Sequence, residues 1–180
     1  MTDSSVPVAP SPSDRAFRLK SGAEVRAGWL ARDLPFMSRS LRYLLRGEVD
    51  TVRRDFGLEN GDISVLAVVA ANPGVTQNDV STALVLKKSA VTRVVQRLES
   101  QGLLRRRRCP SDRRANLLTL TDDGLQLAEA LRAAIERRHQ DWFARIDDDE
   151  GAVFFDVLFR LVDHMTATLG GALPEGAVDD

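Results

Sequence analysis

The stretch that decides the fold spans residues 87–124 and reads KKSAVTRVVQRLESQGLLRRRRCPSDRRANLLTLTDDG. Apolar residues in its first part recur every three or four positions, which predicts a helix that begins near Lys88 and ends at Gly102. Two short runs follow at 103–107 and 116–120, and a turn-rich connector separates them. The sequence therefore predicts a helix followed by a β-hairpin with a basic tip.

Two shorter helices are predicted before this stretch. Thr76, with Asp79 three residues later, forms a near capping box, which predicts a helix from there through Leu84. The segment ISVLAVVA at 63–70 has a helical apolar stripe, although a buried strand would suit the same residues. Only a tight two-residue connection separates the second short helix from the helix that follows, as in a helix-turn-helix.

Long helices are predicted on both sides of this segment. An apolar stripe predicts a helix over about 34–55, and residues 24–32 form a separate turn before it. Downstream, Thr121 caps a helix expected to end near Arg145, and the acidic run at 147–150 opens another helix. Both downstream helices carry apolar residues at near-heptad spacing, which one short winged domain cannot bury alone.

The predicted fold is mainly α, with a small β-hairpin wing: a winged helix-turn-helix with N- and C-terminal dimerisation helices. A chain of 180 residues suffices for one core with appendages. We expect the chain to divide into a flexible arm at 1–24, an N-terminal dimerisation region at 25–58, a winged DNA-binding domain at 59–120, C-terminal dimerisation helices at 121–170 and a flexible tail at 171–180.

The charge of the chain is unevenly distributed. The net charge is −1, but residues 62–120 carry ten basic and four acidic side chains, a net +6, whereas residues 121–180 carry a net −9. A basic middle segment is typical of a protein that binds nucleic acid, and a merely solvated basic face is the alternative. The helix pair predicted ahead of the basic hairpin favours DNA.

The composition argues against several other classes of protein. The apolar runs fall far short of the about 20 residues that cross a bilayer, and the N-terminus lacks a secretory pattern, so we expect no membrane partner and a cytoplasmic location. Cys109 is the single cysteine, which excludes an intrachain disulfide and a multi-cysteine zinc module. We expect no metal and no cofactor. The chain has no GxSxG, GKS/T or HExxH motif, and we do not expect an enzyme.

On these residues the sequence resembles the multiple-antibiotic-resistance regulator (MarR) family of bacterial transcription factors. The resemblance rests on PGVTQNDVSTAL at 73–84 and on the stretch quoted first, with its recognition helix, Gly-Leu turn, Asp-x-Arg wing and Leu-Thr-x-x-Gly end. It implies an obligate homodimer, often with a small ligand held between the dimerisation and DNA-binding lobes. Two positions depart from the family pattern: Lys87 replaces a frequent capping Ser or Asp, and Val85 replaces a common turn glycine.

The resemblance also implies which residues contact DNA. It places Ser89, Thr92 and Arg93 at major-groove positions, and it places Arg114 in the wing beside Asp112. These residue types suit the task, because Arg and Lys bind guanine or phosphate, Gln pairs with adenine, and Ser and Thr suit either. The full set of candidate DNA-binding residues is Thr76, Gln77, Lys87, Lys88, Ser89, Thr92, Arg93, Gln96, Arg97, Asp112, Arg113 and Arg114.

A ligand pocket is a further hypothesis. Side chains of the first long helix, together with one histidine of a later helix, would line a site for an aromatic or carboxylate ligand, although a plain dimer core explains the apolar members. These candidate ligand-binding residues are Phe36, Arg39, Ser40, Tyr43 and His139.

The sequence thus predicts a transcriptional regulator with three partners: double-stranded DNA, a second copy of itself, and a small-molecule effector. Its most specific form is a homodimeric repressor that the effector releases from a palindromic operator. Two alternatives stay open, namely a redox-responsive regulator acting through Cys109 and a winged-helix module that binds protein.

Overall fold

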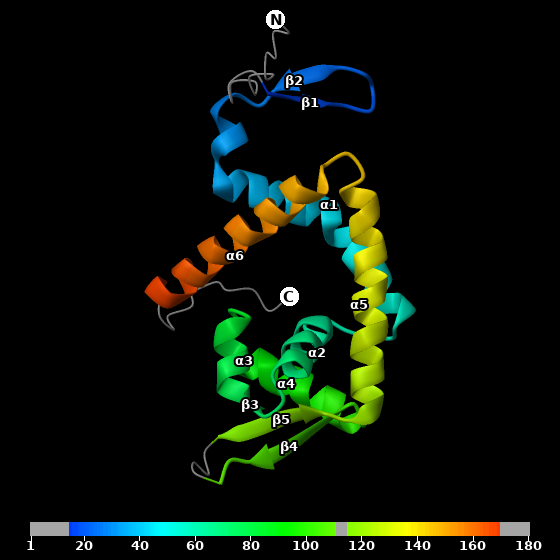
Figure 1. The fold of residues 1–180 in the computed structure, drawn as a ribbon, viewed down its shortest axis with the longest axis vertical. Coiled ribbons are helices and arrows are strands. Elements are labelled where there is room, and N and C mark those ends of the chain that lie inside the picture. Colours follow the sequence, from blue (N-terminus) through cyan, green and yellow to red (C-terminus); the bar gives the residue numbers. More distant parts are fainter. Residues whose placement is uncertain (1–14, 111–114, 170–180) are drawn as a thin grey trace, which may run out of the picture. The chain divides into compact units, whose positions relative to one another are not determined.

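The computed structural model describes residues 15–110 and 115–169, and in this part of the chain it has six α-helices and five β-strands (Figure 1). The predicted fold class, mainly α with a small β-hairpin, is confirmed. The chain forms two compact units, divided after Asp50. None of the helices in the described ranges is long and apolar enough to cross a membrane.

The first unit begins with a small hairpin that the sequence analysis did not predict. Strand β1 (Ala16–Arg18) pairs antiparallel with β2 (Glu24–Arg26), which places Phe17 opposite Val25. An ion pair of 3.1 Å joins Arg18 to Glu24 across the hairpin. The hairpin occupies the end of the segment expected to be a flexible arm, whereas residues 1–14, like the expected tail at 171–180, lie outside the described residues.

The prediction of a separate turn at 24–32 is wrong, because these residues form β2 and a 3₁₀ helix, η2 (Gly28–Arg32). Helix α1 (Leu34–Asp55) then has the predicted bounds. Its start is explained by Asp33, whose carboxylate accepts a hydrogen bond of 2.8 Å from the backbone N–H of Phe36. Pro35 lies in the first turn, where its missing N–H costs nothing.

The second unit holds the winged helix-turn-helix, which appears in Figure 1 as two short helices, a reading helix and an adjoining hairpin. Residues 63–70, for which the sequence suited either a helix or a buried strand, are helical. A two-residue strand that was not predicted, β3, extends the hairpin to a sheet of order β3-β5-β4. The elements are α2 (Asp62–Ala71), β3 (Val75–Thr76), α3 (Gln77–Ala83), α4 (Lys88–Ser100), β4 (Leu104–Arg108), β5 (Asn116–Leu120), α5 (Asp122–Trp142) and α6 (Asp148–Leu169).

One hydrophobic core holds this winged region together. Its buried members come from the end of α1 and the connection after it, from α2, α3 and α4, from the two hairpin strands and from α5, so the reading helix is fixed on a packed base. The apolar stripe predicted for α4 is buried as expected. The core residues are Val52, Leu58, Val65, Leu66, Val69, Val80, Val91, Val94, Val95, Leu98, Leu104, Leu118 and Leu131.

The connection between α5 and α6 differs from the prediction. Helix α5 ends at Trp142 and not near Arg145. The cause is an aromatic cluster at the corner, where the ring of Phe143 lies 6.2 Å from that of Phe154 and 5.4 Å from that of Phe155. Because these contacts bring the start of α6 back against the end of α5, the chain must leave the helix at Phe143.

Candidate nucleic-acid interface

Helix α4 has a buried face and an outward face. Since an α-helix has 3.6 residues per turn, the four buried residues of α4 define one side, and Ser89, Arg93 and Gln96 lie on the other. All three are exposed, and so are Lys87 and Lys88 at the start of the helix. Five of the predicted DNA-binding residues therefore lie on one exposed surface, at the end and side of one helix.

Thr76 and Gln77 lie at the start of α3. The hydroxyl oxygen of Thr76 accepts a hydrogen bond of 3.1 Å from the backbone N–H of Asp79, so the predicted cap is confirmed. The side-chain amide of Gln77 donates a 2.7 Å hydrogen bond to the hydroxyl oxygen of Thr92 on α4. Two predicted DNA-binding residues, Gln77 and Thr92, are thus in direct contact, and their contact joins the two helices of the motif.

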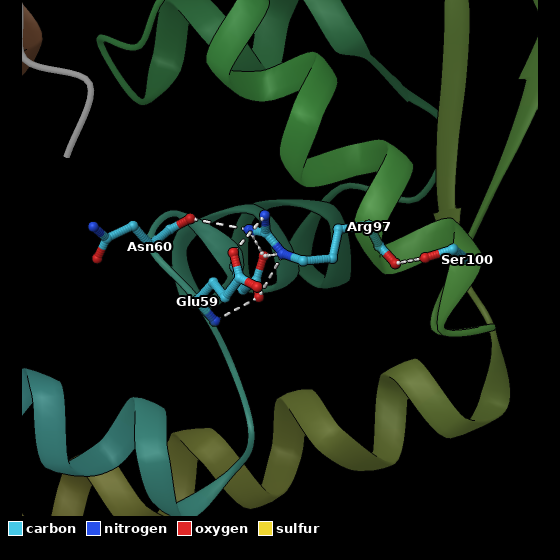
Figure 2. A network of polar contacts seen from close by, with 5 residues as sticks. Glu59, Asn60, Arg97 and Ser100 are labelled. Atoms are coloured by element: carbon cyan, nitrogen blue, oxygen red, sulfur yellow. Dashed lines mark hydrogen bonds and ion pairs between the residues drawn. The ribbon is translucent and has the colours of Figure 1, made fainter.

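Arg97 is held by acidic groups on the opposite flank of α4 (Figure 2). Its guanidinium lies 2.5 Å from a carboxylate oxygen of Asp62 and 3.0 Å from one of Glu59, and it donates a hydrogen bond of 3.2 Å to the backbone carbonyl of Asn60. The Asp62 side chain is fully buried. The hydrogen bonds to Asp62 raise the pKa of Arg97 above its usual value, so the guanidinium stays charged.

This network gives Arg97 a structural task. It joins the reading helix to the first turn of α2 and to the connection before it, and the Asp62 carboxylate also accepts a 2.8 Å hydrogen bond from the backbone N–H of Glu59. We therefore leave Arg97 out of the interface proposed below. Sequence reasoning missed Asp62, because an acidic residue in a first helical turn looks like an exposed partner of the helix dipole.

The wing arginines also divide into two kinds. Arg106 makes an ion pair with Glu99 of α4 and is partly buried, whereas Arg105, Arg107 and Arg108 are exposed. Alternation along β4 separates Arg106 from Arg105 and Arg107, because neighbouring residues of a strand point to opposite faces, and Arg108 is exposed at the end of the strand. The predicted wing contacts Asp112, Arg113 and Arg114 lie outside the described residues.

The base of the wing is locked to the start of α5. Thr121 donates a backbone hydrogen bond of 3.0 Å to Leu103, and its side-chain oxygen accepts one of 3.1 Å from the N–H of Gly124. A side chain at Gly124 would place its first carbon 2.0 Å from the carbonyl oxygen of Leu103. The Leu-Thr-x-x-Gly pattern therefore requires glycine for close packing.

The turn between α3 and α4 contains the two departures from the family pattern. Val85 has a φ of 54°, a left-handed conformation that is uncommon for a β-branched residue. Lys87 is the N-cap of α4, and its side chain makes no capping hydrogen bond in the described structure. A glycine at position 85 would relieve the left-handed backbone, and a Ser or Asp at position 87 could supply the missing cap.

A cavity of about 610 Å³ lies between α2 and α5. His139, one of the predicted ligand-binding residues, lines it, and its ring also stacks on Phe155 at a centroid distance of 5.9 Å. The apolar wall from α2 was missed, because its residues look like ordinary core in the sequence. The lining consists of Ile63, Leu66, Ala67, Ala70, Ala71, Leu125, Ala128, Glu129, Leu131, Arg132, Ile135, Glu136 and His139.

The other predicted ligand-binding residues, Phe36, Arg39, Ser40 and Tyr43, lie on α1 in the first compact unit. The guanidinium of Arg39 lies over the ring of Phe36, 5.6 Å from its centroid, and Tyr43 is 79% exposed. No group of three or more His, Cys, Asp or Glu side chains that suits a metal ion occurs within 15–110 and 115–169.

A short helix that supports a second, outward-facing helix, beside a hairpin with exposed arginines, defines a winged helix-turn-helix protein. The sequence pattern of the MarR family matches residues 56–115. A Thauera aromatica protein, whose name assigns it to transcriptional regulation of the hcr operon, is 33% identical over 140 residues, which cover 77% of this chain and 84% of that protein. The chain therefore belongs to the MarR family, whose members are DNA-binding transcriptional regulators.

Solved structures of regulators agree with this assignment. The PcaV regulator from Streptomyces coelicolor, solved in complex with its natural ligand, has a TM-score of 0.61 and 33% identity, covering 74% of this chain and 94% of PcaV. The transcriptional repressor CouR, bound to a 23-mer DNA duplex, has a TM-score of 0.66 and 26% identity, covering 77% of this chain and 99% of CouR.

Proposed function

We propose that this protein is a homodimeric repressor that binds a palindromic operator and is released from it by a small molecule. The observation that carries the proposal is the outward face of α4, where Ser89, Arg93 and Gln96 are exposed opposite a fully buried stripe. Such a face can enter a major groove while the packed core fixes its orientation. The similarity to CouR, a repressor solved on DNA, supports the same role.

The homodimer is supported by the apolar residues that α6 leaves exposed. They include Val153, Phe155, Phe159, Val162 and Met165, a set that favours burial against a second copy of the chain. Two copies would then present two reading helices, which explains why the proposed operator is an inverted repeat.

The proposed effector site is the cavity between α2 and α5. Its walls are mainly apolar, and α5 adds the polar side chains of Glu129, Arg132, Glu136 and His139, an arrangement suited to an aromatic ligand with a polar or carboxylate group. The similarity to PcaV, which was solved with a ligand, supports an effector. Ligand binding there would act on α2, the helix to which Arg97 ties α4.

The test is selection of duplexes from a random-sequence pool by the full-length protein, followed by titration of the selected duplex. We expect an inverted repeat with half-site centres about 10 bp apart. If six or more phosphates are neutralised, the plot of log affinity against log salt has a slope of about −5 or steeper. A flat salt response, or no enriched sequence, would contradict the proposed function.

A further inference from the structure

The hydroxyl group of Thr92 is engaged within the protein. Its proton is donated to the backbone carbonyl of Lys88 at 2.8 Å, and its oxygen accepts the 2.7 Å hydrogen bond from Gln77. The direction of both bonds follows from chemistry, because the Lys88 carbonyl can only accept and therefore takes the single hydroxyl proton. The Gln77 amide must then donate, which fixes its orientation as well.

Thr92 lies at the edge of the outward face of α4. It is half-buried, and it is one helical turn from both Lys88 and Gln96, which are exposed. The hydroxyl gives its proton to Lys88 and one of its two lone pairs to Gln77, so its remaining capacity is one acceptor lone pair, and the methyl group is the apolar part of the side chain that another molecule can contact. The hydroxyl has no proton left for the acceptor atoms of a base edge.

We propose that Thr92 recognises a thymine through contact between its methyl group and the 5-methyl group of the base. Thymine is the base whose major-groove edge carries a methyl group, and apolar side-chain contact is a known way to recognise it. Gln77 is the positioning residue, because its hydrogen bond keeps the hydroxyl of Thr92 turned towards α3. The inference rests on the proposed role of α4 and adds a base preference to it.

The test uses the duplex selected by the full-length protein, in which each thymine of a half-site is replaced singly by deoxyuridine. This exchange removes only the 5-methyl group. We expect one position per half-site at which the dissociation constant rises about fourfold. This change corresponds to the free energy lost when one methyl group is no longer buried. The measured quantity is the ratio of the two dissociation constants for one protein, so changes in folding or in overall affinity cancel.

Three variants separate the methyl group from the hydroxyl group. Thr92→Val retains a methyl group and loses the hydroxyl, so the thymine-to-uracil ratio should stay near four. Thr92→Ser retains the hydroxyl and loses the methyl group, so the ratio should fall to about one. Gln77→Ala removes one of the two hydrogen bonds that hold the Thr92 hydroxyl, so the ratio should fall part of the way towards one. Arg93→Ala, the control, should weaken binding without changing the ratio.

The reverse result would overturn the inference. If Thr92→Ser keeps the thymine-to-uracil ratio near four, another side chain contacts the 5-methyl group and the inference fails. If no thymine in a specifically bound duplex responds to the exchange, the proposed function stands and the inference fails. If no duplex is selected at all, the proposed function fails together with it.

Discussion

The winged region buries its apolar residues, whereas α6 leaves its apolar residues exposed. In the winged region Val65, Leu66 and Leu98 are completely buried, whereas Phe159 on α6 is 72% exposed. No side chain between Asp148 and Thr168 is buried in the described structure. The winged region therefore folds on a core of its own, whereas α6 leaves an apolar surface exposed, as the proposed dimer requires.

The largest expected effect concerns the internal support of the winged region. Arg97→Ala leaves the buried carboxylate of Asp62 without its main partner, and removing one member of a buried ion pair typically costs about 3–5 kcal/mol. Because Arg97 retains some exposure, we expect the lower end, about 3 kcal/mol, in the free energy of unfolding measured with urea. Arg93→Ala, four residues earlier on the exposed face, is the matched control and should change the free energy of unfolding by less than about 1 kcal/mol, the value of an exposed contact. Equal stability of the two variants would show that the pair does not support α4.

The second effect concerns α6 and the proposed dimer. Phe159→Asp places a charge in the exposed apolar face, and loss of a central interface aromatic typically costs about 2 kcal/mol or more, about thirtyfold in the dimer dissociation constant. Sedimentation equilibrium measures this constant directly. Asp163→Asn, an exposed polar change on the same helix, is the control and should leave it unchanged. A dimer that tolerates Phe159→Asp would place the interface elsewhere.

The same contrast explains what the sequence predicts well. The starts of α3 and α5 and the buried stripe of α4 follow from local signals, such as the Thr76 and Thr121 caps, and the structure confirms them, whereas the end of α5 differs from the prediction. Asp62 was not identified, since its partner Arg97 lies far along the chain and only the fold brings the two together. The hairpin at 16–26 was missed for another reason, because its strands are three residues each and bury nothing that would produce an alternating pattern.

The cavity between α2 and α5 is another feature that the sequence could not predict. A wall of small and apolar residues on α2, such as Ala67 and Ala70, has the same sequence pattern whether it faces a core or an open space. His139 was identified because a polar ring on an apolar stripe is unusual. His139 lines this cavity, whereas the four predicted residues of α1 are not among its lining residues, and the role of His139 as a ligand contact stays a prediction.

The third effect concerns DNA binding by the exposed residues of α4, as opposed to the structural support that Arg97 provides. Arg93→Ala removes an exposed guanidinium, and a guanine-type contact carries about 1–3 kcal/mol of discrimination between bases. We therefore expect a relaxed preference among operator variants, about fivefold or more at one position, measured by fluorescence anisotropy on matched duplexes. A uniform loss across all duplexes would instead assign Arg93 to phosphate.

The smallest effect comes from the turn that joins the two helices, where the left-handed backbone of Val85 is retained at a cost. That conformation costs a side-chain-bearing residue about 1–2 kcal/mol, and glycine avoids this cost but loses about 0.5–1 kcal/mol through its freer unfolded chain. Val85→Gly should therefore stabilise the protein by about 0.5–1 kcal/mol in thermal or urea unfolding. Val85→Ala is the matched control, because alanine has the same backbone restriction and should bring little gain. If alanine stabilises as much as glycine, the free-energy cost at this position arises from the exposed branched side chain and not from the backbone. The left-handed turn before α4 would then not destabilise the fold.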